Sequence, residues 1–566
     1  MRRCDQIHGL QHEHGGLRPG FWDPTRQAAI LTAILLQAVS AVAQTGAYHV
    51  AGSVVNSVTG EPVSGAMVAL LSVTDSATIS STETGPDGHF VLDHLSAAKF
   101  QLTASRAGYR AGFYNQHGNF NTAIVTGEGQ DTGRIVFKLA PEAVLSGTVT
   151  GDGGDPVERA TVVLFEKPNS HDPDAKIRTA GSTITDDTGY YEFPNLRAGE
   201  YLLAVRARPW YAISHFSTNL IGQSETEQQA ALDVAYPVTY FDSTADEGSA
   251  TPIVLASGSH QQANINLHAV PALHIQVQTP PRPDGSPVQP ELRQTIFGLD
   301  VPGGNPIMSR SRADGSTELD GVAPGQYELT QGDPPRIVDL NATESLQVDP
   351  AAGTPAFAVN GTLQPAPGTT LRDGGYVLTL DPVGGDAIAS PQNAFSNSRS
   401  FALNAIVVGT WRLHASDGLE IVSISADGHT HPGNLLTVQD HALSIVVTVS
   451  ANRSERIEGT TQRGGKGFAG AMVVLVPKDL NAMAELARRD QSDSDGSFAL
   501  YNAKPGDYTV VAIEDGWDLD WANPAVIARF LPAGEPVTVK DSSGGQPDGR
   551  LERRISLAEP VAVQPR

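Results

Sequence analysis

Two short stretches carry side chains of the kind that bind metal ions. His429 and His431 are separated by one residue, so on a strand both imidazoles point to the same side. The run DQSDSDGS, residues 490–497, resembles part of a calcium-binding loop. The sequence offers no third ligand near the histidines, and Asn502 stands where a calcium loop has its bidentate glutamate. We therefore expect no metal site and no cofactor, and we assign these aspartates to a turn.

The motifs of common enzyme chemistry are absent from the sequence. It contains no H-E-x-x-H zinc helix, no G-x-S-x-G nucleophile elbow and no G-x-x-x-x-G-K-S/T phosphate loop. Asp518 and Asp520 are of the residue type that glycosidases use in pairs, but such a pair acts only across a cleft, which the sequence does not indicate. We therefore expect that the protein is not an enzyme and has no catalytic residues.

Aromatic residues offer a binding chemistry instead. Trp210 and Trp517 each lie nine residues after a tyrosine, Tyr201 or Tyr508, of a repeated segment. A flat ring just past a strand is suited to stacking against a sugar, with polar groups at its rim for the hydroxyls. Such a ring can instead plug the end of a β-sandwich, and the sequence leaves both interpretations open. The candidate ligand-binding residues are Trp210, Tyr211, Trp517, Trp521, Asp518 and Asp520.

These aromatics follow a segment that occurs four times without a gap. The copies begin GPDGHFVLDHL, DDTGYYEFPNL, RADGSTELDGV and DSDGSFALYNA. Their shared positions are a turn glycine (Gly88, Gly189, Gly315 and Gly496) and, twelve residues later, an aromatic (Phe100, Tyr201, Tyr327 and Tyr508). A fifth copy keeps Phe401 and Trp411 but has Arg399 in place of the glycine. Glycine permits the positive φ of a tight turn, and the alternating residues after it predict a strand with one buried face. We expect the aromatics to point inward.

Short strands separated by glycine and proline turns predict an all-β protein. We expect tandem Ig-like or transthyretin-like β-sandwich modules preceded by an N-terminal signal segment. The exception is DLNAMAELARRDQ, residues 479–491, which has the best helical pattern after the signal segment. The expected divisions are a signal peptide at 1–43, then sandwiches at 44–140, 141–270, 271–346, 347–450 and 451–566, the third and fourth being divergent.

The repeated pattern resembles a known family. The opening strand with G-x-V, the turn G-x-P-V-x-G-A and the hairpin D-x-x-G-x-F-x-L-x-x-L-x-x-G-x-Y are similar to the carboxypeptidase regulatory-like domain. This resemblance implies a seven-stranded transthyretin-like sandwich, related in shape to carbohydrate-binding folds. It also implies that such domains accompany another component, such as a zinc carboxypeptidase or a transporter. Carbohydrate is the ligand class that the resemblance favours.

Composition and charge limit the possible partners. The chain of 566 residues carries 62 acidic and 38 basic residues, a net charge of −24, which disfavours a protein that tracks nucleic-acid phosphates. The apolar run QAAILTAILLQAVSAVAQ follows Arg26 and ends near Ala41-Val42-Ala43, a pattern typical of a signal-peptidase site. It is short for a bilayer span, so we expect export and no membrane span in the mature chain.

We therefore predict an exported, non-enzymatic binding scaffold of several modules, located in the periplasm, on the cell surface or outside the cell. The predicted partners are a polysaccharide or a cell-surface glycan or protein. One alternative is a purely structural or adhesive protein of the cell envelope. Another is an accessory subunit of a peptidase or a transporter.

Overall fold

The computed structural model describes residues 47–566 with gaps. The segments that it leaves undescribed within this range are 169–176, 213–230, 279–281, 283–284, 287, 300–307, 313, 350, 368, 370, 372–374, 384–391, 397–398, 417–418, 452–454 and 541–552. The predicted signal peptide at 1–43 lies outside the described residues.

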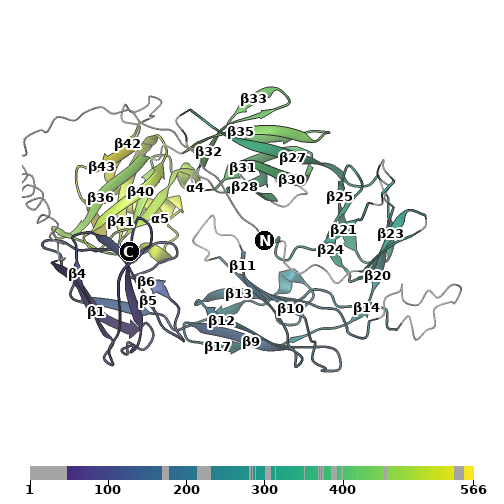
Figure 1. The fold of residues 1–566 in the computed structure, drawn as a ribbon, viewed down its shortest axis with the longest axis horizontal. Helices are drawn as coiled ribbons and strands as arrows, with labels where there is room; N and C mark the ends of the chain where they lie inside the picture. Colours follow the sequence, from purple (N-terminus) through teal and green to yellow (C-terminus); the bar gives the residue numbers. More distant parts are fainter. Residues whose placement is uncertain are drawn as a thin grey trace, which may run out of the picture.

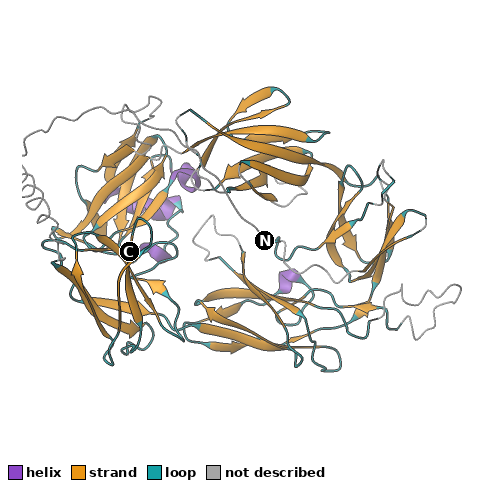
Figure 2. Cartoon of the chain, in the orientation of Figure 1, coloured by secondary structure: helices purple, strands orange, loops and turns teal. Residues whose placement is uncertain are grey.

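The described chain is an all-β protein of successive β-sandwiches, as predicted (Figures 1 and 2). We number these sandwiches, or modules, one to five along the chain. Each has its own apolar core between two sheets. In Figure 1 the modules follow one another around a ring, so the purple N-terminal module lies beside the yellow C-terminal one. The module boundaries given above stay a prediction.

Module one packs a three-stranded sheet on a five-stranded sheet. Its first strand pairs antiparallel with the hairpin strand and parallel with the closing strand. Alternation in the sequence places Val50 and Val54 of the first strand in the core. The strands are β1 (Tyr48–Asn56), β4 (His89–Leu95) and β8 (Ile135–Leu139) in one sheet, and β2 (Met67–Ser72), β3 (Thr78–Glu83), β5 (Lys99–Ser105), β6 (Gly112–Phe113) and β7 (Ile124–Val125) in the other.

Module two repeats this arrangement. Its first sheet contains β9 (Ala143–Thr150), β12 (Tyr190–Leu196), β17 (His260–Gln262) and β18 (Ile265–Asn266). Its second sheet contains β10 (Thr161–Glu166), β11 (Arg178–Ile184), β13 (Gly199–Arg206), β15 (Thr239–Tyr240) and β16 (Ile253–Leu255). A 3-10 helix, η1 (Glu247–Ser249), and a two-stranded ladder of β14 (Val234–Ala235) with β19 (Val270–Pro271) complete it.

Modules three and four share a continuous sheet, because β25 of one pairs antiparallel with β27 of the other. Module three contains β20 (Leu273–Gln278), β22 (Met308–Ser311), β23 (Ser316–Val322) and β26 (Leu346–Val348), with β21 (Glu291–Arg293), β24 (Gly325–Gln331) and β25 (Arg336–Ala342). Module four contains β27 (Thr354–Pro365), β30 (Ser400–Val407), β32 (Leu419–Ala426), β33 (His429–Pro432) and β35 (Leu443–Ala451), with β28 (Val377–Pro382), β29 (Gln392–Phe395), β31 (Gly409–Ala415) and β34 (Leu435–Val438).

Module five adds short helices to the sandwich. Its strands are β36 (Glu455–Arg463), β37 (Lys466–Gly467), β38 (Met472–Pro477), β39 (Arg488–Gln491), β40 (Ser497–Ala503), β41 (Gly506–Ile513), β42 (Glu535–Val539), β43 (Arg553–Ser556) and β44 (Val561–Gln564). Its helices are η2 (Leu480–Ala482), α4 (Met483–Leu486), η3 (Gly516–Asp518), α5 (Pro524–Ile527) and η4 (Ala528–Ala533). The helix predicted over 479–491 is therefore wrong in its second half, where β39 pairs antiparallel with β38. Pairing with a neighbouring strand overrides the local helical pattern.

The repeated hairpin has the geometry that its sequence predicts. The four turn glycines adopt φ values of +74°, +74°, +84° and +86°, and the copy with Arg399 has φ of +145° at that residue. The aromatics Phe100, Tyr201, Tyr327, Tyr508 and Trp411 are all buried, which confirms that they point inward.

Each module also has an irregularity that the sequence did not indicate. One residue near the end of the first hairpin strand adopts a positive φ, and the pairing register shifts beside it. These residues are His94, Asn195, Gly321, Ala405 and Asn502. A shift of this kind is a β-bulge, which bends the strand before it turns back into the next one.

Candidate functional site

Trp210 and Tyr211 lie four and five residues after the end of β13 in module two. Trp210 is 84% exposed, and its ring is perpendicular to that of Tyr211, with ring centroids 5.7 Å apart. Tyr211 is half-buried. Burial, with a smaller contribution from a hydrogen bond to Tyr211, raises the pKa of the neighbouring Tyr236. Trp210 thus presents a ring to solvent beside an aromatic that is anchored in the protein.

Trp517 lies in η3 of module five and has a different environment. The imidazole of His117, from module one, stacks on it with centroids 4.9 Å apart and an interplanar angle of 5°. Phe120 lies 5.3 Å away at a tilt of 34°. Trp517 also packs against the cluster of apolar residues on the outer face of β38 and β41. A face that the sequence offers to a sugar is therefore covered by another module.

The remaining candidates in module five contribute mainly to packing and turns. Trp521 is 7% exposed, and the guanidinium carbon of Arg489 lies 4.1 Å from its ring centroid. Asp520 accepts a hydrogen bond from Asn523 Nδ2 at 3.0 Å. Asp518 is exposed and lies 3.5 Å from an Arg566 nitrogen. Ligand binding by Trp517, Trp521, Asp518 and Asp520 stays a prediction.

The segment 491–494 of module five joins module one through a set of hydrogen bonds that we call the closing contact. Gln491 Nε2 donates to the carbonyl of Asn115 at 2.6 Å and to Thr122 Oγ1 at 2.7 Å. The nitrogen of Ser494 donates to the carbonyl of Ala123 at 2.9 Å. The amide of Val125 donates to Ser494 Oγ at 2.7 Å. Backbone and side-chain groups of both modules thus take part in this contact.

An ion pair between a buried carboxylate and a half-buried lysine lies within the closing contact. Asp493, which is buried, pairs with Lys99 of module one and accepts a hydrogen bond from the amide of Ala123 at 3.0 Å. Burial raises the pKa of Asp493, while Lys99 opposes that rise. Burial also raises the pKa of Asp490 to about 6. Asp493 of the DQSDSDGS run therefore connects two modules, which the sequence did not indicate because its partners are more than 360 residues away.

A cluster of titratable residues lies where modules two and three meet. His274 Nε2 lies 2.6 Å from Asp233 Oδ2, and His274 Nδ1 lies 3.1 Å from Asp320 Oδ1. Asp320 is 1% exposed. The two carboxylates raise the pKa of His274 to about 9, although its burial opposes this. The cationic imidazole therefore bridges the carboxylate of Asp320 in β23 and that of Asp233, in the segment before β14.

The same three residues have the composition of a metal site. One ligand atom from each lies within 4.8 Å of the others. An imidazole binds a metal through a deprotonated nitrogen, whereas both nitrogens of the protonated His274 face carboxylates as donors. The arrangement thus fits an ion-pair bridge better than a metal centre. Sequence reasoning missed it, because the three positions lie 41 and 46 residues apart and belong to no motif.

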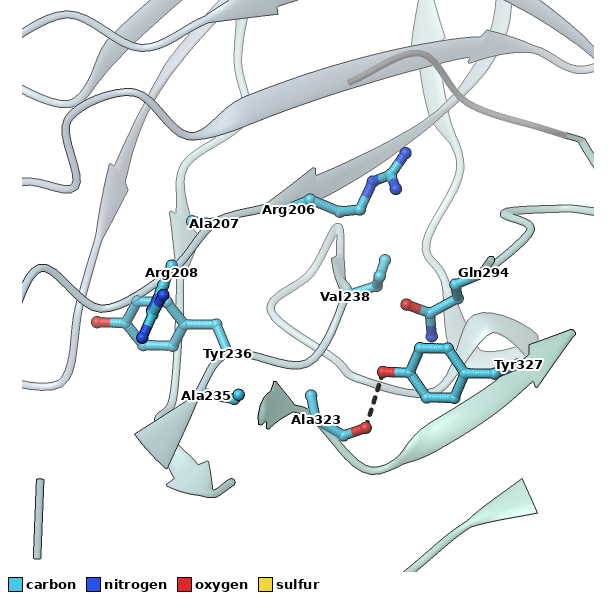
Figure 3. Close-up of a pocket in the computed structure, with 10 residues that line it drawn as sticks. Arg206, Ala207, Arg208, Ala235, Tyr236, Val238, Gln294, Ala323 and Tyr327 are labelled. Atoms are coloured by element: carbon cyan, nitrogen blue, oxygen red, sulfur yellow. Dashed lines mark hydrogen bonds between the residues drawn. The ribbon is translucent and has the colours of Figure 1, made fainter. Parts of the chain in front are cut away.

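A small cavity lies beside this junction (Figure 3). Its wall includes Arg206, Tyr236, Gln294 and Tyr327, and Tyr327 donates a hydrogen bond to the carbonyl of Ala323 at 2.7 Å. The cavity holds about 20 Å³, enough for a water molecule and too little for a sugar or a cofactor.

Comparisons with known proteins agree with the fold. The carboxypeptidase regulatory-like domain matches residues 49–139 and 144–232, so the chain contains two such domains in tandem. No curated protein sequence matches the chain. The chain is a multi-domain all-β protein, and the two matched segments fall in its first two modules.

The solved structures that match the chain include a bacterial TIE protein and pilins, all with low TM-scores. The TIE protein of Bacillus anthracis is 9% identical, with 94% of this chain and 79% of that chain covered and a TM-score of 0.16. A streptococcal ancillary pilin is 10% identical, with 53% and 98% covered and a TM-score of 0.19. The major pilin BcpA of Bacillus cereus is 11% identical, with 74% and 98% covered and a TM-score of 0.14. Values this low give no basis for carrying over a function. No helix among the described residues is long and apolar enough to cross a membrane.

Proposed function

We propose that the protein is an exported, non-enzymatic scaffold that binds polysaccharide through Trp210 and Tyr211 of module two. The observation that carries this proposal is the 84% exposure of Trp210 next to a perpendicular, half-buried Tyr211. An exposed tryptophan ring has a large apolar face, which packs against the C–H face of a pyranose. Tyr211, held by its contact with Tyr236, supports the position of that ring.

Export is part of the proposal and rests on the apolar run before Ala43. The partner is a polysaccharide or glycan outside the cytoplasm. A single platform binds weakly, so we expect dissociation constants in the millimolar to micromolar range for one site, about −4 to −8 kcal/mol.

The experiment is binding of the full mature chain to a panel of neutral polysaccharides, with tryptophan fluorescence and affinity electrophoresis as readouts. Trp210→Ala should abolish retardation by the polysaccharide that the native chain binds. Phe395→Ala is the matched control, because Phe395 is an exposed aromatic of module four, 67% accessible. Unchanged binding by the Trp210 variant, or equal losses in both variants, would reject the proposed site.

A purely structural or adhesive role is the second candidate, and the environment of Trp517 favours it. The stack on His117 and the closing contact use aromatic and acidic residues of module five to hold two modules together. If no polysaccharide perturbs the fluorescence of the native chain, this second function replaces the first.

A further inference from the structure

A groove lies between modules one and two, and Trp210 is not among the residues that line it. Its wall is formed by residues 110–116 and 118, by residues 136–140 in and after β8, and by Arg197, Ala198 and Ser257 of module two. Its volume is about 570 Å³, within the range of ligand sites in proteins. Junctions between domains are frequent places for such sites.

The charge of this groove is opposite to that of the whole chain. Arg110, Lys138 and Arg197 line it, and none of its lining residues is an aspartate or a glutamate. The chain as a whole carries 24 more acidic than basic residues. Burial and the nearby charge of Arg197 lower the pKa of Arg110, so these guanidinium groups lie close enough to repel each other. A set of like charges held together in this way attracts an anion.

The framework positions each of these cations differently. Arg110 Nη1 donates to the carbonyl of Asn195 at 2.6 Å, which ties module one to the bulge of module two. Lys138 is the exposed residue between the buried Phe137 and Leu139 of β8. Arg197 is exposed and lies 3.7 Å from a Glu166 oxygen that is closer, at 2.9 Å, to Arg178. The charged groups of Lys138 and Arg197 can therefore bind an anion that enters the groove.

The loop of module one that forms the opposite wall is held in a defined shape. Gln116 accepts a hydrogen bond from the amide of Phe113 at 3.1 Å and donates to the carbonyl of Gly118 at 2.9 Å. The carbonyl of Asn115 is bound by Gln491 from module five. Tyr114 packs against Phe137 with ring centroids 6.1 Å apart. The closing contact thus fixes a wall of the groove, which lowers the entropic cost of binding there.

We propose that this groove binds an anionic segment of a polysaccharide, with Lys138 and Arg197 recognising a carboxylate or sulfate group on a sugar. The proposal rests on the polysaccharide function given above and assigns it a second, charge-selective subsite. Half-buried Phe113 and Tyr114 supply apolar surface beside the cations, which suits a sugar ring that carries a charge.

The test is calorimetric titration of the full mature chain with oligogalacturonate, which carries carboxylates, and with its methyl-esterified counterpart, which is neutral. The double variant Lys138→Gln/Arg197→Gln should weaken oligogalacturonate binding about 10- to 100-fold, because hydrogen bonds to charged groups contribute about 1.5–3 kcal/mol. Raising the salt concentration from about 0.1 M to about 1 M should weaken the binding of oligogalacturonate to the native chain, because the screening length falls from about 10 Å to about 3 Å. The same titration with a sulfated oligosaccharide shows whether the groove prefers a sulfate or a carboxylate group.

Lys478→Gln is the control for charge alone, because Lys478 is an exposed lysine of module five outside the groove. Equal losses in the control and in the double variant would overturn the groove as the site. Equal affinity for the neutral ester, or tighter binding of an acidic peptide such as oligoglutamate, would overturn the ligand class. Loss of neutral-polysaccharide binding in Trp210→Ala together with unchanged acidic binding in the double variant would reject the groove and leave the proposed function standing. Binding of neither neutral nor acidic sugar by the native chain would reject both.

Discussion

The inward aromatic of each hairpin has a polar contact that recurs in the modules. The hydroxyls of Tyr201, Tyr327 and Tyr508 donate to the carbonyl four residues upstream, at 3.0, 2.7 and 2.8 Å. In module four the indole nitrogen of Trp411 does the same at 3.0 Å, to Val407. The ring packs in the core, while its polar atom binds the turn that precedes the strand. A single residue thus links the core to the turn. In module one Phe100 keeps the ring without the polar atom.

The two contributions of this aromatic can be separated in module two. Tyr201→Phe removes only the hydrogen bond and should lower the free energy of local unfolding by about 1 kcal/mol. Tyr201→Ala also removes the ring and should lower it by about 3–5 kcal/mol. Hydrogen exchange of the β13 amides in the full chain measures both. Tyr190→Ala, at an exposed position of β12, should change it by less than about 0.5 kcal/mol. Equal effects of the two Tyr201 variants would contradict the assignment.

At the scale of strands and turns, the sequence predicts what local chemistry determines. The turn glycines were predictable, because glycine is the residue type that most readily adopts a positive φ, as Gly189 does. The bulges were not, because His94, Asn195 and Ala405 reach positive φ through the surrounding sheet and carry no common residue type. The strand β39 was missed for the same reason, since pairing with β38 outweighs a helical pattern. For the candidate binding site, the spacing of the aromatics indicated Trp210 and Trp517 as ligand-binding residues. It could not show that another module covers one of the two rings, because that contact joins distant parts of the chain.

The ion-pair bridge between β20, β23 and the segment before β14 should make the junction of modules two and three sensitive to pH. His274 has a folded pKa of about 9 against an ordinary value of 6.5, so its contribution is complete below about pH 6.5. It is lost as the pH rises through about 9. Thermal unfolding followed between pH 6 and pH 10 should therefore show a junction that weakens over this range.

Asp320→Asn should remove much of that pH dependence and cost about 3 kcal/mol at neutral pH, because it leaves a buried charge with one partner fewer. His268→Asn is the control, since His268 pairs with an exposed Asp152 at 2.8 Å on the surface of module two. A pH profile of the Asp320 variant identical to that of the native chain would refute the role of the bridge.

At the scale of the whole molecule, the closing contact converts a row of sandwiches into a ring (Figure 1). Its two sides lie more than 360 residues apart, so closing it restricts a long chain. The residues responsible are mainly polar on the module-five side, and polar residues in a turn give no sequence signal of a distant partner. The stack of Trp517 on His117 adds buried apolar surface to the closing contact. The hydrogen bonds alone contribute little net stability, because water can replace each partner when the contact opens.

Opening this contact should change the shape of the molecule without unfolding its modules. Gln491→Ala removes the donors to Asn115 and Thr122, and Lys99→Ala removes the partner of the buried Asp493, so the double variant leaves an uncompensated charge that favours solvent. Small-angle X-ray scattering should show a larger radius of gyration for the double variant, with circular dichroism unchanged. Gln347→Ala, at an exposed position of β26, should leave the radius at the native value. Because Asn115 also lies in the wall of the groove between modules one and two, the open form should bind oligogalacturonate more weakly. An unchanged radius in the double variant would mean that the remaining contacts, chiefly those of Ser494 and Trp517, are sufficient to hold the ring closed.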